Sequence, residues 1–336
     1  MKKITLFGIA LLLSLSLILG ACTSSASAPA PGGEEVDLDP DDLEAGNRSA
    51  TLRIAVLPIV DNFPLFMADE EALFEDFELD IELIPVSSAP ELSQLFASGQ
   101  VDGMVTDGLT VAFFNQETIQ AQIVRYAQRP SPDAGHFFIL AAKESGITTP
   151  EDLKGVEIGI SEGTIIEYVT DRLLEREGFA AEEITTVAVP KIPDRMALLG
   201  SGEIKAAVLP DPLASLAVSQ GASIILDDSQ SPEYGASVYV FSTNIIDTNP
   251  EAVRKFIEVI DTSIRLIAAD PEEYRYVLET RELVPPDLLP TYVIPSFPNG
   301  IYTQQEWDDT ITWAQEKGLL SVNIPYENVV NDSFLP

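Results

Sequence analysis

The feature that most constrains the fold is the alternation of short apolar strands with helices in the first half of the chain. Residues 51–57 are predicted to form a mostly apolar strand closed by Pro58, and residues 79–84 alternate apolar and polar side chains with the period of two that strands show. Helical patterns follow each of these strands, at 64–74 and 90–98. Short turns between strands and helices favour a mostly parallel sheet covered by helices on both faces.

A second alternation of the same kind begins after an extended run at 136–142. Its predicted strands are 156–160, 184–189, 206–209 and 223–226. After a further extended run at 237–241 the pattern changes, because the helices predicted from residue 250 onward follow one another with no strand between them. We therefore expect an α/β protein with two lobes and a helical C-terminal tail.

Residues 1–21 have the composition of a secretory signal peptide. Lys2 and Lys3 precede an apolar run from Ile4 to Leu19, which is shorter than the about 20 residues that a membrane-spanning helix needs. The sequence then reads Gly-Ala-Cys22, and Cys22 is the only cysteine of the chain. These residues resemble the lipobox of bacterial lipoproteins. The resemblance implies that Cys22 carries acyl chains such as palmitate, which anchor the protein to the extracytoplasmic face of a membrane. The alternative is an ordinary signal peptide with an incidental cysteine.

The composition excludes some partners. The chain has 54 acidic and 19 basic residues, a net charge of −35, which repels nucleic acid and anionic lipid headgroups. Residues 22–50 are rich in small and acidic residues and lack aromatic ones, so they cannot bury enough apolar surface to offset their ordering entropy. We expect this stretch to be a disordered tether; a propeptide without a role is the alternative.

Six short motifs occur in order along the folded part. They are Leu52–Val56, Phe63–Phe66, Leu95–Gly103, Glu151–Gly155, Ile158–Thr164 with Glu167 and Tyr168, and Ala206–Pro212. Each motif is short, but their order and spacing together resemble the substrate-binding lipoproteins of ABC importers. The resemblance is to the group that binds nitrate, sulfonates, taurine and thiamine precursors, which has the type II periplasmic binding protein fold.

This resemblance implies two α/β lobes, joined by two crossover strands, that close on a ligand. The crossovers would be 136–142 and 237–241. Residues 51–140 and 241–336 would form lobe 1, and residues 141–240 would form lobe 2. The expected partners are a small-molecule solute and the permease and ATPase subunits of the importer. We expect a monomer that needs no cofactor or metal.

The candidate binding residues follow the predicted strands, because ligands of open parallel sheets bind beyond the carboxyl ends of the strands, where helix N-termini also point. The residues selected by this rule are Asp61, Asn62, Phe63, Thr106, Asp107, Ser161, Gly163, Thr164 and Asp211. Ser161 or Thr164 is a candidate helix cap, with Glu167 at the third helical position, and Gly163 lets the backbone approach a ligand. A capping box with no ligand role is the alternative for this turn.

Aromatic residues are candidates for a stacking wall. They are Phe63, Phe113, Tyr168 and Tyr239, of which Phe63 and Tyr168 are our candidate ligand contacts. For each of them a place in the hydrophobic core is the alternative. His136 is the only histidine, and we favour a structural role for it over a ligand contact.

The charges predict the kind of solute. Asp61, Asp107, Glu162, Glu167 and Asp211 are acidic, whereas Lys191 and Arg195 are the only basic residues expected near the second-lobe half of the site. Because unpaired carboxylates make an anion costly to desolvate, this balance favours a neutral or amine-bearing heteroaromatic solute such as a pyrimidine precursor of thiamine. A nitrate-like or sulfonate-like solute requires backbone N–H groups to dominate the site.

Two other functions compete with capture and delivery of a solute. The first is an enzyme that makes a pyrimidine on the same fold, or one that works through carboxylates. One histidine and no second cysteine leave no Ser-His pair or metal cluster in the pattern, so we expect no enzyme activity. The second is a solute sensor, which is usually fused to a membrane helix and a signalling module, and neither pattern is present in this sequence.

Overall fold

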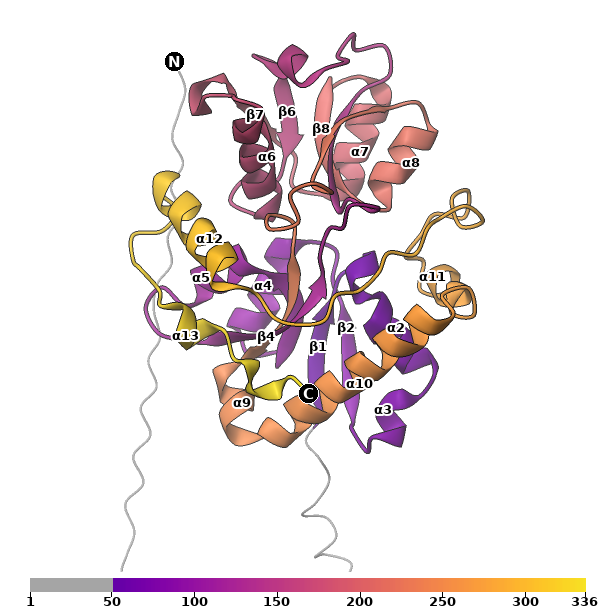
Figure 1. Ribbon diagram of the computed structural model, residues 1–336, viewed down its shortest axis with the longest axis vertical. Helices are drawn as coiled ribbons and strands as arrows, with labels where there is room; N and C mark the ends of the chain where they lie inside the picture. Colours follow the sequence, from indigo (N-terminus) through magenta and orange to yellow (C-terminus); the bar gives the residue numbers. More distant parts are fainter. Residues whose placement is uncertain (1–50) are drawn as a thin grey trace, which may run out of the picture. The chain divides into compact units, whose positions relative to one another are not determined.

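Two five-stranded mixed sheets form the framework of the protein (Figure 1). The computed structural model describes residues 51–336, and Cys22, the signal peptide and the tether predicted above lie outside them. In the first sheet the strand order is β2-β1-β3-β10-β4, and in the second it is β7-β6-β8-β5-β9. Each sheet with its helices makes one lobe, so the predicted two-lobed α/β fold is confirmed.

The first lobe is built on parallel strands with helices between them. Its strands are β1 (Leu52–Val56), β2 (Ile81–Pro85), β3 (Gly103–Asp107) and β4 (Ala121–Gln128), with the late strand β10 (Ser237–Ser242). Its helices are η2 (Val60–Asn62), α2 (Phe63–Glu70), α3 (Leu73–Asp76), α4 (Ala89–Ala97) and α5 (Gly108–Phe114). β1 runs parallel to β2 and β3, whereas β10 runs antiparallel to β3 and β4. The side chains of Ile54 and Ala55, which point to opposite faces of β1, are almost fully buried, as expected for a sheet that is covered on both faces.

The second lobe repeats this arrangement. Its strands are β5 (Phe137–Ala141), β6 (Glu157–Ile160), β7 (Thr185–Ala188), β8 (Ala206–Pro210) and β9 (Ser223–Asp227). Its helices are η3 (Pro150–Leu153), α6 (Ile165–Arg176), η4 (Ala181–Glu183), α7 (Ile192–Ser201) and α8 (Leu213–Ser219). β6 is parallel to β7 and β8, and β5 is antiparallel to β8 and β9. In each sheet, therefore, one antiparallel strand lies beside an otherwise parallel set.

The predicted lobe boundaries at residues 140 and 240 need correction. Strand β5, residues 137–141, pairs only with strands of the second sheet, and β10, residues 237–242, pairs only with strands of the first. A strand belongs as a whole to the sheet that satisfies its backbone hydrogen bonds. The chain consequently changes lobes within residues 129–136 and 228–236, just before the two extended runs that we predicted to be the crossovers.

The C-terminal segment is helical, as predicted. Its elements are α9 (Thr243–Thr248), α10 (Pro250–Ala269), α11 (Arg275–Thr280), α12 (Gln304–Glu316), α13 (Tyr326–Val329) and η5 (Asp332–Phe334). Asn249 caps α10, whose apolar face includes Val253, Phe256, Ile257 and Ile260 at helical spacing and packs against α2. None of the helices in residues 51–336 is both long enough and apolar enough to cross a bilayer.

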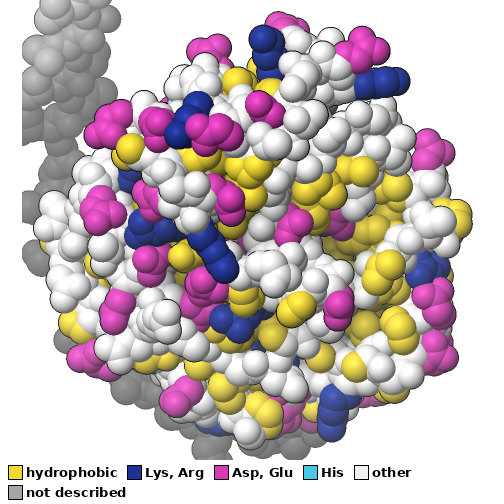
Figure 2. Space-filling model, turned by 45° about the horizontal axis from the view of Figure 1, so that its top comes forward, with side chains coloured by type: hydrophobic (Ala, Val, Ile, Leu, Met, Phe, Trp, Pro, Cys, Tyr) yellow, Lys and Arg dark blue, Asp and Glu magenta, His cyan; other side chains and the backbone are white. Residues whose placement is uncertain are grey.

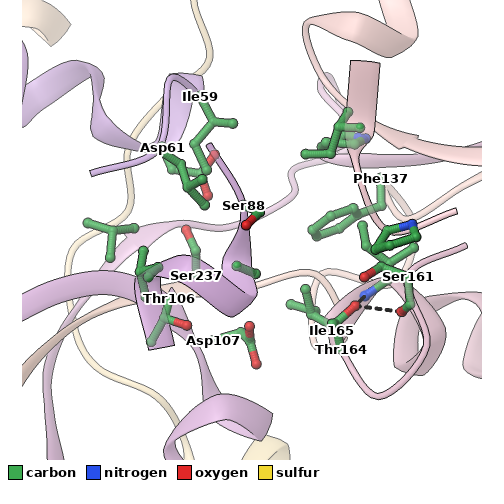
Figure 3. Close-up of a pocket in the computed structure, with 18 of the residues that line it drawn as sticks. Ile59, Asp61, Ser88, Thr106, Asp107, Phe137, Ser161, Thr164, Ile165 and Ser237 are labelled. Atoms are coloured by element: carbon green, nitrogen blue, oxygen red, sulfur yellow. Dashed lines mark hydrogen bonds between the residues drawn. The ribbon is translucent and has the colours of Figure 1, made fainter. Parts of the chain in front are cut away.

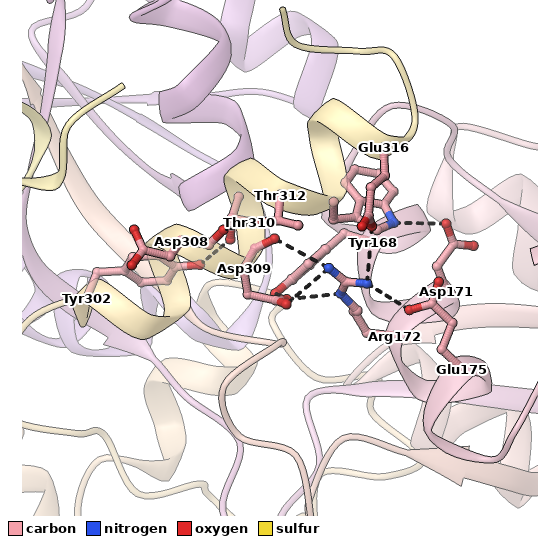
Figure 4. A network of polar contacts seen from close by, with 11 residues as sticks. Tyr168, Asp171, Arg172, Glu175, Tyr302, Asp308, Asp309, Thr310, Thr312 and Glu316 are labelled. Atoms are coloured by element: carbon pink, nitrogen blue, oxygen red, sulfur yellow. Dashed lines mark hydrogen bonds and ion pairs between the residues drawn. The ribbon is translucent and has the colours of Figure 1, made fainter. Parts of the chain in front are cut away.

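Helix α12 contacts both lobes (Figure 1). It packs against α5 of the first lobe, and Glu306 in its first turn bonds the Tyr126 hydroxyl and forms an ion pair with Arg129. Farther along, Asp309 accepts hydrogen bonds from Tyr168 and Arg172 of α6 in the second lobe (Figure 4). The C-terminal tail therefore joins the two lobes to each other.

The contact between α12 and α6 also includes two packed aromatic rings and further polar partners. The Trp313 ring packs edge-on against the Tyr168 ring, with 5.4 Å between centroids, and its Nε1–H donates to Asp171 at 2.9 Å. Lys317, just after α12, forms ion pairs with Glu167 at 2.8 Å and Asp171 at 3.0 Å. We call this set of α6–α12 contacts the helix clasp.

The acidic residues do not form one patch on the face shown in Figure 2. Carboxylates and basic side chains are interspersed there, and apolar side chains gather near its centre and right. On this face, therefore, the acidic side chains are not concentrated at one docking surface.

The helix clasp should contribute to stability through Asp309. Replacing Asp309 with Ala leaves the Arg172 guanidinium and the Tyr168 hydroxyl without this acceptor, which should lower the free energy of unfolding by about 2 kcal/mol. Urea unfolding of the protein produced without residues 1–22 measures this loss. Asp308→Ala is the matched control, because Asp308 is an exposed residue of the same helix turn, and it should change stability by less than about 0.5 kcal/mol. Equal effects of the two substitutions would contradict the clasp.

Candidate functional site

A cleft between the lobes is the candidate binding site (Figure 3). It encloses about 810 Å³, part of it open to solvent, and is lined by residues that follow strands β1 and β3 of the first lobe and β6 of the second. This is the position where open α/β sheets bind ligands. Apolar side chains form much of the wall, among them Ile59, Ile165, Ile192 and Phe137.

The first lobe contributes mainly hydrogen-bond acceptors. Asp107, at the end of β3, is the N-cap of α5 and accepts hydrogen bonds from the N–H and the hydroxyl of Thr110. Burial raises the pKa of Asp107, against the lowering effect of these hydrogen bonds. Thr106 and Ser237 lie beside it in the cleft, and Figure 3 shows their side chains on the first-lobe side, facing those of the second lobe.

Asp61 also lines the cleft, but its charge is compensated. One carboxylate oxygen lies 3.1 Å from Nε2 of His136, and both side chains are at most 3% exposed. Burial acts to raise the pKa of Asp61, but the charge and hydrogen bond of His136 outweigh it and leave the pKa below its usual value. Burial likewise acts to lower the pKa of His136, and Asp61 outweighs it and raises the pKa to about 9. The two residues are therefore a buried ion pair at neutral pH.

The backbone around His136 holds this ion pair in place. The Nδ1 of His136 lies 2.7 Å from the carbonyl of Gly235, and the N–H groups of His136 and Phe137 donate to the same oxygen of Asp228. Burial raises the pKa of Asp228 to about 6. A Cβ atom on Gly235 would lie 1.9 Å from Asp228 Oδ2, so this close approach of the two crossing segments requires glycine. Both ring nitrogens of His136 thus have partners within the protein, and its structural role remains our prediction because the residue borders the cleft.

The second lobe contributes the N-terminus of α6 and the residues before it. Thr164 caps this helix by accepting from the N–H of Ile166, and its own hydroxyl donates to the carbonyl of Ser161 at 2.7 Å (Figure 3). Glu167, at the third position of the helix, accepts from the N–H of Gly163, whose φ of +67° favours glycine. The predicted cap is confirmed. The side chain of Ser161 also lines the cleft, but it does not cap the helix.

Arg195 of α7 is a second cleft residue of this lobe, and it is fully buried. Its Nε donates to the carbonyl of Val208 at 2.6 Å and its Nη1 to the carbonyl of Val189 at 2.7 Å. Its Nη2 has no hydrogen-bond partner within residues 51–336. Burial alone lowers the pKa of Arg195 to about 10, so the guanidinium stays charged at neutral pH.

The structure brings together half of the predicted site residues. Asp61, Thr106, Asp107, Ser161 and Thr164 all line the cleft. Their contact with a solute remains a prediction.

The other predicted site residues lie elsewhere. The Asn62 side chain donates to the carbonyl of Leu57, and Phe63 is buried in the first-lobe core against Phe297. Gly163 serves the turn before α6, and Tyr168 belongs to the helix clasp. Asp211 accepts from the hydroxyls of Tyr292 and Ser215 in a neighbouring hollow.

The aromatic wall predicted from the sequence is also different. Tyr239 packs edge-on against Phe256 in the first-lobe core, and Phe113 is absent from the cleft lining. The aromatic ring in the cleft is that of Phe137, which Figure 3 shows on the second-lobe side. Phe137 and Ser237 were both missed, although each lies at the start of an extended run that we predicted to be a crossover. Among residues 51–336, no group of three or more His, Cys, Asp or Glu side chains is placed to hold a metal ion.

The fold, with a cleft between two α/β lobes, matches that of solved two-lobed structures. The alkanesulfonate-binding protein SsuA of Xanthomonas axonopodis pv. citri, solved with MOPS bound, matches with a TM-score of 0.72 over 85% of this chain and 99% of that chain, at 18% identity. The periplasmic nitrate-binding protein NrtA of Synechocystis PCC 6803 matches with a TM-score of 0.64 over 84% of this chain and 86% of that chain, at 15% identity. The predicted type II periplasmic binding protein fold is confirmed.

The family is shown by the sequence. The family described as NMT1/THI5 like matches residues 60–274, and the chain belongs to it. A curated relative is the 4-amino-5-hydroxymethyl-2-methylpyrimidine phosphate synthase of Saccharomyces cerevisiae, 25% identical over 224 residues. That alignment covers 62% of this chain and 64% of the yeast protein, so the chain spans less than two thirds of that relative's length.

The His136–Asp61 ion pair predicts a pH dependence of stability. The folded-state pKa of His136, about 9, lies above the unfolded value of 6.5, so its stabilisation is complete below pH 6.5 and is lost as the pH rises through 9. Between pH 7 and pH 10 the loss should be about 2.5 kcal/mol. Urea unfolding at these two values measures it.

The matched variant is the double substitution His136→Gln with Asp61→Asn. It removes both charges. Between pH 7 and pH 10 its free energy of unfolding should therefore fall by about 2.5 kcal/mol less than that of the parent protein. Titration of groups that do not interact with His136 occurs in both proteins and cancels in the comparison, whereas Asp228, whose pKa the charge of His136 lowers, does not. The same pH dependence in both proteins would show that His136 is not charged in the fold.

Proposed function

We propose that this protein is the extracytoplasmic solute-binding component of an ABC importer, which captures a small molecule between its lobes and delivers it to a membrane permease. The observation that carries the proposal is the convergence of polar groups from both lobes on one apolar-walled cleft. A cleft shared in this way couples binding to lobe closure, and the closed form is what a permease can recognise. The roles that SsuA and NrtA have by name support the same function.

The solute that fits this cleft best is an amine-bearing heteroaromatic molecule, such as a pyrimidine precursor of thiamine. Phe137 offers a face for a flat ring, and Thr106 and Asp107 offer acceptors for an amino group. The name of the yeast relative, which refers to an aminopyrimidine, supports this class. A nitrate-like or sulfonate-like solute is the alternative, which the structural neighbours favour.

A pyrimidine-making enzyme is the second candidate function, because the yeast relative is a synthase by name. Such catalysis would need a reactive group in the cleft. The chain's only histidine is 2% exposed, and its two ring nitrogens lie within hydrogen-bond distance of Gly235 and Asp61. A histidine engaged in this way lacks a free nitrogen for proton transfer to a ligand. We therefore favour binding without turnover.

The cleft predicts how binding should respond to substitution. Screening the soluble part by thermal shift against vitamins and their precursors, amines, nitrate and sulfonates identifies a solute, because a tight ligand raises the melting temperature. Asp107→Asn keeps a good helix cap but removes the carboxylate, and Ser161→Ala removes a hydroxyl. Each should weaken binding of an amine-bearing hit about tenfold or more by calorimetry.

Glu162→Gln is the control for this experiment. Glu162 lies in the same turn as Ser161 but is exposed and is not among the residues that line the cleft, so affinity should stay within about twofold. Unchanged affinity in both cleft variants would place the binding site elsewhere. Recovery of chemically altered solute after incubation with the protein would instead favour the enzyme.

The lipid anchor at Cys22 belongs to the same proposal, because an acylated protein stays beside its membrane permease. Full-length protein produced in a bacterial host should incorporate labelled palmitate, and Cys22→Ala should abolish incorporation because the thiol is the acceptor. Ser24→Ala, two residues away, should leave the label unchanged. Wild-type protein without label would contradict the anchor.

A further inference from the structure

Arg195 is a buried charge without a counter-ion. Its side chain is fully buried at the cleft, and burial is the only influence on its pKa, so no carboxylate of residues 51–336 compensates it. Two of its nitrogens are held by backbone carbonyls, which fixes the guanidinium plane. A buried cation without a counter-ion lowers the free energy of unfolding. Proteins tolerate this loss at sites where a bound ligand supplies the counter-ion.

The neighbouring groups on the second-lobe side are also donors. Ser161 lines the same cleft, and its hydroxyl makes no hydrogen bond within the residues that the structure describes. The amide of Ile165, at the first position of the 12-residue helix α6, has no acceptor within its helix. The positive end of the helix dipole adds to the charge of Arg195. This side of the cleft is therefore suited to an anion.

The first-lobe side is suited to the opposite kind of group. Asp61 and His136 compensate each other, so that pair adds no net charge to the cleft. Asp107 has no ion-pair partner within residues 51–336, and with Thr106 it offers acceptor oxygens. Donors on one side and acceptors on the other match a ligand that is itself dipolar.

We propose that the solute carries an acidic group that binds Arg195 and Ser161, in addition to an amino group that faces Asp107 and Thr106. This inference rests on the proposed solute-binding function and deepens it, because it replaces a neutral solute by a dipolar one. A charge-assisted hydrogen bond from Nη2 would give the free nitrogen of Arg195 its missing partner. The acidic end would be drawn to the second lobe and the hydrogen-bond-donating amino end to the first, so such a solute would favour closure.

Four pyrimidine probes separate the two ends of the solute. They are 4-amino-5-hydroxymethyl-2-methylpyrimidine, its phosphate ester, 4-amino-2-methylpyrimidine-5-carboxylate and 2-methylpyrimidine-5-carboxylate. Calorimetry with the purified soluble part should show that one or both of the acidic aminopyrimidines bind at least tenfold more tightly than the neutral hydroxymethyl probe. The carboxylate and phosphate probes tell whether the acidic group is planar or tetrahedral.

Substitutions show which residue binds each end of the solute. Arg195→Gln keeps hydrogen-bond donors but removes the charge. In this variant the acidic and neutral probes should bind with about equal affinity, and the affinity for the neutral probe should change less than threefold. Asp107→Asn should weaken the aminopyrimidine-carboxylate but not the carboxylate that lacks the amine. Lys191→Gln removes an exposed charge just before α7 that does not line the cleft, and should leave every affinity within twofold.

Folding is checked separately, because Arg195 also holds two carbonyl groups. The melting temperature without any probe shows whether Arg195→Gln is folded at the temperature of the titration. If it is not, Arg195→Lys serves in its place and should keep a preference for acidic probes that is weaker than that of the parent protein, because it retains charge without the planar fork.

The outcomes separate this inference from the proposed function. Equal binding of neutral and acidic probes, or a preference that survives Arg195→Gln, would overturn the acidic subsite and leave solute binding intact. Failure of all four probes would also overturn it as stated. The proposed function itself would fail only if the broader solute screen found no hit sensitive to substitutions in the cleft.

Discussion

The first lobe depends on the pairing of β10 with β3 and β4. Strands β3 and β4 are not neighbours in the sheet, because β10 lies between them. Among residues 51–336, β10 is the only strand beside β4. Since β10 is the only strand that pairs with β4 in a ladder, apart from single bonds to the C-terminal tail such as the Ile123–Val330 bridge, the first sheet is complete only when the chain has passed through the second lobe and returned. This return also brings Ser237 and the crossing segments to the cleft, so the same pairing that completes the sheet builds part of the site.

Much of the fold could be predicted from the sequence, because strand and helix patterns are local. The positions of the extended runs at 136–142 and 237–241 were correct, but their sheet membership was not, because a period of two in the sequence does not tell which neighbours a strand will have. Asp61, Thr106, Asp107 and Ser161 were found for a similar reason. The carboxyl end of a strand is a local feature, and the fold class places these ends at one cleft.

The predicted site residues that lie outside the cleft lining were placed there by helix geometry and distant partners. Asn62 and Phe63 follow Asp61 directly, but the chain is already helical there, so successive side chains turn away from the cleft into the core. Tyr168 meets Asp309, which is 141 residues away in the sequence. No local pattern encodes that contact.

The charge of the cleft was the least predictable property for the same reason. Counting residues suggested an acidic site, whereas Asp61 is paired with His136 and Glu167 with Lys317. Asp211 is bound by Tyr292 outside the cleft. With these charges accounted for, Asp107 and Arg195 remain as the exceptions, one on each lobe.

The helix clasp has a consequence for how the lobes can move. Because α12 is bonded to both lobes along one side of the protein, a rotation that separated the lobes there would have to break several ion pairs together. Long side chains such as Arg172 and Lys317 can keep their contacts through small displacements, but not through a wide parting. If the lobes part, that side should act as the pivot, and the cleft should widen on the side away from it.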